Sequence, residues 1–422
     1  MIGVILWLIL GLILVRWATQ LWLECLNRRQ VQAHASVVPE QFQGMIDQPT
    51  YIRSVKYTLA KGRLAQFETT YDTLLLIVVL FSGLLPWALT CLTHYLGESA
   101  WAMAIYLFTI GVALSLPGLP LAWYHQFRLE QRFGFNTTTQ KLWWLDRGKA
   151  FVLGAVIGFP LLVLILKLVD WTAQAWWLWA WGALLAFQLL MSFLAPIVIL
   201  PLFNKFTPLP EGSLRERLLR LAERTRFRTR SIQIMDGSKR SRHSNAFFTG
   251  FGRFRRIVLF DTLIQQLAES ELEAVLAHEI GHFNKKHIPK MLLFSAVASL
   301  VGFYILSQIA KADLFYRSFG FEKRNIAVAL LLFALLSGLV TFWFSPLAHW
   351  WSRRYEYQAD AFALDVMTEP ASLVRALRKL NEKNLTNLTP HPMYSRFYYS
   401  HPTLLEREQA LQVKAESLTC ES

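Results

Sequence analysis

The sequence predicts an all-helical protein that crosses the membrane several times and carries a small α+β domain on one side. Of its 422 residues, 54% are hydrophobic and only 17% are charged. The mean hydropathy of +0.31 is too high for an ordinary soluble chain of this size. Seven apolar runs approach or exceed the roughly 20 residues that cross a bilayer as a helix. Two long polar stretches, one between these runs and one after them, are large enough to fold.

The predicted membrane passes are the apolar runs themselves. In chain order they cover 3–23, 73–92, 101–123, 151–166, 171–203, 291–310 and 326–349. No basic segment precedes the first run and no small-residue cleavage site follows it, so we expect an anchor rather than a cleaved signal. The fifth run exceeds one pass, and Pro196 and Pro201 predict that its end breaks or leaves the membrane.

Lys and Arg are distributed unevenly among the connecting segments, and short positive segments of membrane proteins stay in the cytoplasm. Six of these residues follow the first run within 24–72, none lies within 93–100, and 204–290 is the most basic segment. Only the connection 311–324 runs against this pattern. We therefore expect an outside N-terminus, with 204–290 and the C-terminal tail in the cytoplasm.

The net charge of +14 has two interpretations. Clustered basic residues bind nucleic-acid phosphates, but anionic lipid headgroups and the positive-inside pattern explain the same charge. We expect membrane lipids as partners and no nucleic acid. The three cysteines, Cys25, Cys91 and Cys420, have no spacing typical of a zinc ribbon or a disulfide framework.

The chain is expected to divide into passes one to five (1–203), an α+β segment (204–290), passes six and seven (291–349) and a C-terminal segment (350–422). Within 204–290, Ser213 and Glu216 have the capping-box spacing of a helix through Arg226. Three strands are predicted at Ser231–Met235, 245–249 and Arg256–Phe260. The last two resemble a hairpin joined through Gly250 and Gly252.

A second capping-box pattern, Ser270 with Glu273, predicts a helix that runs to about Lys286 and breaks at Pro289. This helix contains the strongest functional motif of the chain. His278 and His282 lie four residues apart and therefore project from one helix face, so both imidazoles can bind one Zn²⁺ ion. Glu279 flanks them at the position of a general base that activates water.

Catalytic zinc usually has three protein ligands, so a third must come from elsewhere. Glu356 and Asp360 follow the seventh run one helical turn apart. Glu356 could bind the metal while Asp360 orients a ligating imidazole. Alternatively, both carboxylates pair with Arg353 and Arg354 on a solvated helix. In that case the third ligand would be an acid such as Glu271 or Glu273, or one near the C-terminus.

The histidine motif, together with the run from Ser352 to Asp360, resembles the type I C-a-a-X prenyl endopeptidases, relatives of the smaller heat-shock membrane metalloproteases. Stretches at 201–209, 244–247, 256–263 and 399–402 agree with that resemblance. The resemblance covers most of the chain, and its metal motif shows no departure here.

The resemblance implies a zincin-like domain with one Zn²⁺ per chain, bound by His278, His282 and Glu356, with Glu279 and Asp360 assisting catalysis. It further implies seven tilted helices around a large water-filled chamber, and His401 beside the substrate carbonyl. By the same analogy, the strand with Asn245, Ala246, Phe247 and Phe248 binds the substrate peptide by β-augmentation.

The leading interpretation is a membrane zinc metalloendopeptidase that processes C-a-a-X ends of peptides or proteins, prenylated in the family. One alternative keeps the chemistry but assigns it to membrane-protein quality control. A zinc-binding transporter or channel is the alternative of another class, but its ligands should lie near the membrane midplane rather than at helix ends. The catalytic site should face the cytoplasm, in the inner membrane of a bacterium or the endoplasmic reticulum of a eukaryote.

Overall fold

The structure is a computed structural model that describes residues 2–229, 231–249 and 256–421. Within this part of the chain, six helices are long and apolar enough to cross a membrane. Their ranges are Ile2–Ala33, Gln48–Phe81, Ala100–Glu130, Gln140–Phe203, His287–Ile309 and Ile326–Val366. The fourth range turns back at Ala173, whose φ is +44°, so that α7 (Phe159–Thr172) packs against α8 (Trp176–Leu194). With this hairpin counted as two passes, the helices give the seven passes that the sequence predicts.

The second pass differs from its predicted bounds. The apolar run 73–92 was expected to form one helix, but α2 (Gln48–Phe81) ends at Phe81. Gly83 has a φ of +79°, a left-handed conformation that only glycine adopts without strain, and α3 (Leu84–Leu96) starts anew after it. The pass is therefore the apolar half of α2, and the basic residues 53–63 lie on this helix rather than in a loop.

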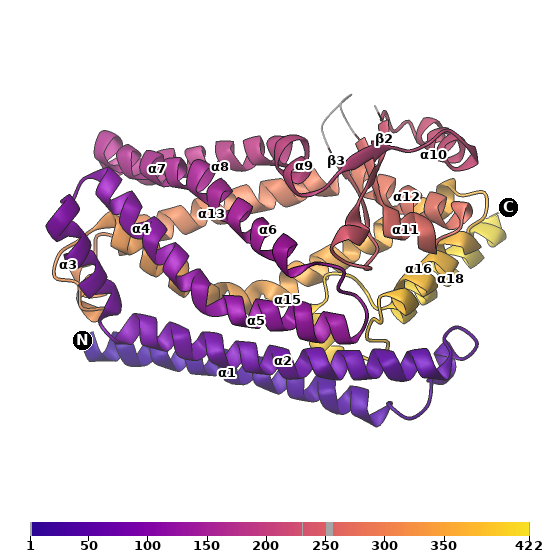
Figure 1. Ribbon diagram of the computed structural model, residues 1–422, viewed down its shortest axis with the longest axis horizontal. Coiled ribbons are helices and arrows are strands. Elements are labelled where there is room, and N and C mark those ends of the chain that lie inside the picture. The colour runs from indigo at the N-terminus through magenta and orange to yellow at the C-terminus, as the bar shows by residue number, and fades with distance from the viewer. Residues whose placement is uncertain (1, 230, 250–255, 422) are drawn as a thin grey trace.

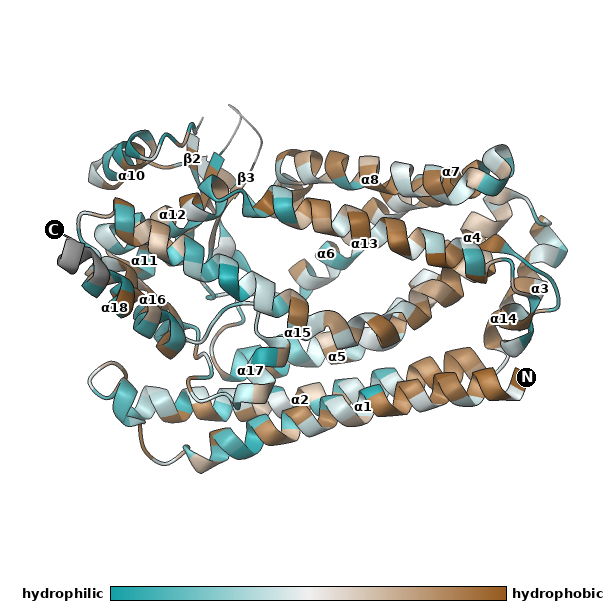
Figure 2. Ribbon diagram, turned by 180° about the vertical axis from the view of Figure 1, so that it is seen from behind, coloured by the Kyte–Doolittle hydropathy of each residue, from teal (hydrophilic) through white to brown (hydrophobic). Residues whose placement is uncertain are grey.

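The helices form two layers with crossing helices between them (Figure 1). One layer holds α1 (Ile2–Ala33) and α2, and the other holds α7, α8 and α13 (His287–Ile309). Between them run α4 (Ala100–Ser115), α5 (Leu119–Tyr124), α6 (Gln140–Leu153) and α15 (Ile326–Val366). Hydrophobic residues dominate these helices, whereas hydrophilic residues gather at the end that carries the C-terminus (Figure 2).

The polar end contains a four-stranded sheet in the order β1-β2-β4-β3. Its strands are β1 (Phe206–Pro208), β2 (Ser231–Met235), β3 (Ala246–Thr249) and β4 (Arg256–Phe260). Strand β2 runs parallel to β4, while β1 and β3 are antiparallel to their neighbours. The three predicted strands are confirmed, and β1 was not predicted. The predicted connection through Gly250 and Gly252 lies outside the described residues.

Helices cover this sheet and extend the polar end. They are α9 (Leu200–Phe203), α10 (Ser213–Arg224), α11 (Asp261–Gln266), α12 (Glu269–Asn284), α16 (Ala371–Lys383), α17 (Pro392–Tyr398) and α18 (Leu404–Glu421). The short α14 (Asp313–Ser318) lies at the opposite end of the fold, near α3 (Figure 2). One buried core joins β2, β4, α10, α12 and α16, and a second joins the membrane helices. The first core fixes α12, which bears the histidine motif, against the sheet.

Both capping-box predictions are wrong in detail. The Ser213 hydroxyl donates to Glu269 of α12 instead of capping its own helix. Helix α12 begins at Glu269, and the Glu271 carboxylate accepts from the Ala268 N–H at 2.8 Å. Glu273 instead pairs with arginines of α10. Pairing with α12 thus replaces the predicted cap of α10, whereas α12 is capped by Glu271, two residues before the predicted Glu273.

Candidate metal centre

The centre lies where α12 meets α15, and a glycine sets their separation. A Cβ built on Gly281 would lie 2.9 Å from the Cα of Ala359. Real side-chain carbons do not approach a backbone atom so closely, and only a glycine permits this approach. The contact brings the histidines of α12 opposite Glu356 and Asp360 of α15.

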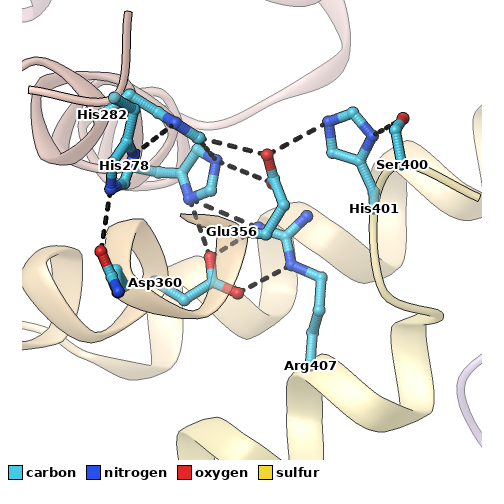
Figure 3. A network of polar contacts seen from close by, with 9 residues as sticks. His278, His282, Glu356, Asp360, Ser400, His401 and Arg407 are labelled. Carbon is cyan, nitrogen blue, oxygen red and sulfur yellow. Dashed lines mark hydrogen bonds and ion pairs between the residues drawn. The ribbon is translucent and has the colours of Figure 1, made fainter. Parts of the chain in front are cut away.

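Three potential metal ligands converge at this crossing: His278, His282 and Glu356 (Figure 3). The two Nε2 atoms lie 3.2 Å apart. His278 Nε2 is 3.4 Å from Glu356 Oε2, and His282 Nε2 is 3.3 Å from Glu356 Oε1. Ligands about 2.0–2.1 Å from a tetrahedral zinc ion are separated by roughly 3.3 Å, close to each of these distances, although the two histidines approach different oxygens of Glu356.

The chemistry of the three donors also suits a cation. Glu356 is 4% exposed, and its Oε2 accepts no hydrogen bond within the described chain. A buried carboxylate oxygen without a donor is costly unless a positive charge faces it. Burial lowers the pKa of the His278 imidazole, but the adjacent carboxylates of Asp360 and Glu356 outweigh it and raise this pKa to about 9. The two carboxylates thus favour a positive charge at this point, and the residues present fit a zinc ion.

Asp360 orients the first histidine. The His278 Nδ1–H donates to Asp360 Oδ1 at 2.8 Å, which leaves the lone pair of Nε2 directed toward Glu356. Asp360 is 2% exposed and accepts two hydrogen bonds from the guanidinium group of Arg407 on α18, from Nε at 2.8 Å and from Nη2 at 2.5 Å. The Asp360 carboxylate is therefore held on one side by an imidazole and on the other by a guanidinium.

The second histidine, His282, is oriented by two successive hydrogen bonds. His282 Nδ1–H donates to His287 Nδ1 at 3.0 Å, and His287 Nε2–H donates to Gln358 Oε1 at 3.0 Å. The His287 ring stacks on Tyr355 with centroids 4.0 Å apart. Sequence reasoning missed His287, Gln358 and Arg407. For His287 and Gln358 a signal existed, because each lies within five residues of a candidate ligand.

Glu279 lies beside the ligands and lines a cavity of about 840 Å³. It forms no hydrogen bond or ion pair with another described residue, and burial raises the pKa of its carboxyl. A carboxyl with a raised pKa that faces a cavity beside a metal-binding cluster is suited to exchange protons with a bound molecule.

Of the five other residues that the family resemblance assigns to the site, three line this cavity: His401, Asn245 and Ala246. His401 Nε2 is 3.4 Å from Glu356 Oε1, and Ser400 contacts the other ring nitrogen. Asn245 and Ala246 line the cavity beside β3, an edge strand of the sheet. Phe247 and Phe248 do not line it: Phe247 packs on Phe260, and Phe248 packs on aromatic rings of the core.

The alternative ligands are engaged elsewhere. Glu271 pairs with Lys379 at 2.7 Å, and Glu273 with Arg217 and Arg224. Arg353 donates to backbone carbonyls rather than to Glu356 or Asp360. Among the described residues, His278, His282 and Glu356 form the group that could hold a metal ion.

Comparisons with known proteins agree with this geometry. Residues 27–205 match the family model of the CAAX prenyl protease N-terminal region with five membrane helices, and residues 208–415 match peptidase family M48. The chain is 37% identical to CAAX prenyl protease 1 of Saccharomyces cerevisiae over 93% of this chain and 92% of that protein. It is 29% identical to the human homologue over 95% and 94% of the two chains. The crystal structure of S. mikatae Ste24p superposes with a TM-score of 0.90 at 34% identity, covering 96% of this chain and 98% of that one.

Proposed function

The chain belongs to the CAAX prenyl protease 1 family of membrane zinc metalloproteases in peptidase family M48, and we propose that it cleaves peptide bonds near the prenylated C-terminus of protein substrates. The observation that carries the proposal is the triangle of His278, His282 and Glu356 beside a cavity that Glu279 lines. The chain is a multi-pass integral membrane protein and a metalloendopeptidase.

We assign one zinc ion per chain to His278, His282 and Glu356. When bound, such an ion polarises a carbonyl and makes water a better nucleophile. The bonds from Asp360 and His287 fix which nitrogen of each histidine faces the ion. The ligands therefore need little reorganisation, because hydrogen bonds already hold their side chains in place.

The other residues act on protons and charge. Glu279 accepts the proton of the attacking water and returns it to the leaving amine, a role that its raised pKa supports. His401, held by Ser400, is placed to donate a hydrogen bond to the carbonyl oxygen as negative charge develops there. Asp360 keeps His278 in the tautomer that presents Nε2.

The substrate peptide is proposed to pair with the outer edge of β3. This edge has no partner strand among the described residues, and Asn245 and Ala246 lie at the cavity wall. Main-chain hydrogen bonds along such an edge bind an extended peptide with little regard to its side chains. The four residues from Asn245 to Phe248 would act through their backbone, so the inward packing of Phe247 and Phe248 does not oppose this role.

The orientation follows from the basic segments. With 204–290 and the C-terminal segment 350–422 in the cytoplasm, the catalytic cavity opens on that side, at the endoplasmic reticulum of a eukaryote or the inner membrane of a bacterium. The segments 1–203 and 291–349 would then supply the seven passes. The candidate ligands lie at the polar end of the fold, away from the apolar middle of the passes, which favours hydrolysis over transport.

Cleavage of paired peptides tests the proposal. A farnesylated peptide with a C-a-a-X end and its unlipidated twin are incubated with the purified zinc-loaded protein, and the products are identified by mass spectrometry. We expect release of the three-residue end from the farnesylated peptide, at a higher kcat/KM than from its twin. Equal kcat/KM values would remove prenyl recognition and favour membrane-protein quality control. Absence of cleavage in both would contradict the substrate assignment.

A further inference from the structure

A second hollow lies on the outer side of the helices, separate from the metal centre. It has a volume of about 520 Å³ and lies between α2 on one side and α5 with the π-helical turn His125–Glu130 on the other. This volume falls within the usual range of small-molecule sites. Helices α2 and α5 lie side by side in both overall views (Figures 1 and 2).

One part of this groove is apolar and exposed. Phe67 of α2 and Tyr124 of α5 line it and are 59% and 50% exposed. Leu121, one turn before Tyr124, completes this part. Aromatic side chains gather where membrane helices pass the headgroup level of the bilayer, so this part of the groove suits the first carbons of an acyl chain.

The other part is strongly basic. Arg63, Arg128 and Arg132 line the groove, and none of them forms an ion pair with a described carboxylate. Arg128 and Arg132 instead lie over the rings of Trp123 and Phe133, which position their guanidinium groups. On the polar domain, by contrast, Arg217 and Arg240 pair with acids.

The order of residues along the two helices separates these parts. On α2, Arg63 precedes Phe67 by one turn, and the apolar end of the helix follows. On α5 and the π-helical turn after it, the order is reversed. Leu121 and Tyr124 follow the apolar helix α4, and Arg128 comes one turn after Tyr124. The arginines therefore share the end of the groove nearer the polar domain, and the apolar residues share the end nearer the membrane interior.

We propose that this groove binds one anionic phospholipid, with its phosphate on Arg63, Arg128 and Arg132 and an acyl chain over Phe67, Leu121 and Tyr124. Guanidinium groups bind phosphate oxygens through paired hydrogen bonds, and basic pockets between membrane helices bind acidic headgroups. Leu64 lines both this groove and the catalytic cavity. The lipid therefore packs on the outer side of the helix whose inner side faces the substrate.

Native mass spectrometry of the full-length zinc-loaded protein, titrated with phosphatidylglycerol or phosphatidylcholine, tests the proposal. We expect one tightly bound phosphatidylglycerol. The triple variant Arg63→Gln, Arg128→Gln, Arg132→Gln should bind it roughly 100-fold more weakly, at about a factor of five per arginine. A matched variant, Arg29→Gln, Arg220→Gln, Arg228→Gln, removes three exposed arginines outside the groove and should leave binding unchanged. Equal affinity for both lipids, or equal loss in both triple variants, would overturn the proposal.

Two further experiments identify the molecule that occupies the groove. Leu121→Trp keeps every arginine but fills the apolar part, and should weaken phosphatidylglycerol binding about tenfold. This variant also serves if the triple variant does not fold, which its melting temperature and zinc content would reveal. Glycerol 1-phosphate that competes as strongly as phosphatidylglycerol would make the ligand a free phosphate. Farnesol that displaces the lipid equally well would make the groove a prenyl site. Either result contradicts the assignment of a phospholipid.

Discussion

Gly281 of α12 packs against Ala359 of α15 at a separation that leaves no room for a methyl group. The added carbon would also lie 3.0 Å from the Ala359 carbonyl oxygen. Neither atom belongs to a flexible side chain, so the helices themselves would have to move apart. The same helices carry the two histidines and Glu356, and this contact therefore sets the distances within the metal centre.

Gly281→Ala is expected to destabilise the protein by about 1–3 kcal/mol and to weaken zinc binding, because overpacking separates the helices. Melting temperature and zinc content measure the two effects. Gly302→Ala is the matched control, since the nearest atom to its added carbon lies at an ordinary 3.7 Å. Similar results for both variants would show that the approach at Gly281 does not position the ligands.

Glu279→Gln should keep zinc but lose peptide hydrolysis, because an amide cannot accept the proton of the attacking water. His282→Ala should lose both, since it removes a donor. Elemental analysis of the purified variants, together with the peptide assay, distinguishes the roles. A Glu279→Gln protein without zinc would mean that Glu279 is a ligand or a structural residue.

Asp360→Asn should lower metal affinity or activity about 10–100-fold, the usual cost of losing a carboxylate that orients a ligating histidine. Arg354→Ala on the same helix is the control, because Arg354 is exposed, lies over Trp350 and forms no ion pair with a carboxylate of the described residues. Its effect should stay within the small range of exposed side chains. Wild-type turnover and zinc content in both variants would contradict the role of Asp360.

His287→Phe should weaken zinc binding about 10–100-fold while the ring keeps its stacking on Tyr355. The reason is that phenylalanine cannot accept the hydrogen bond of His282 Nδ1. Competition with a zinc chelator measures the affinity. Gln358→Leu removes only the next bond of the chain and should have a smaller effect in the same direction. Unchanged affinity in His287→Phe would show that His282 does not need this partner.

Cysteine labelling tests the orientation. In a background with native cysteines replaced by serine, Glu98→Cys should react with an impermeant maleimide from outside, and Glu211→Cys only after the membrane is opened. Both positions are exposed, so accessibility differs only by side of the membrane. The reverse pattern would move the catalytic cavity to the other compartment.

The sequence predicted the membrane passes well because a bilayer imposes length and hydrophobicity on each of them. It misplaced the second pass because Gly83 ends the helix inside an apolar run, where no polar residue marks the turn. The histidine pair was predicted from spacing alone, since one helix supplies both residues. Glu356 required the family resemblance, because its distance from His278 depends on how α12 packs on α15.

The pairing of Arg407 with Asp360 could not be predicted from the sequence for the same reason. Arg407 lies 47 residues from Asp360 on α18, and only the tertiary fold brings them together. Ser213 of α10 shows the reverse case, because it has the local capping-box pattern but bonds to Glu269 of α12 instead. Local rules therefore predicted the helices and strands and the first two proposed ligands, and packing decided the remaining contacts.

Helix α15 is one continuous element of 41 residues that begins as a membrane pass and ends with Glu356 and Asp360. A water-soluble fragment cut from this chain would lose either Glu356, the proposed third ligand, or the apolar half of the helix that carries it. Activity is therefore expected of the whole chain, in a membrane or in detergent, and not of a domain cut free of its membrane helices.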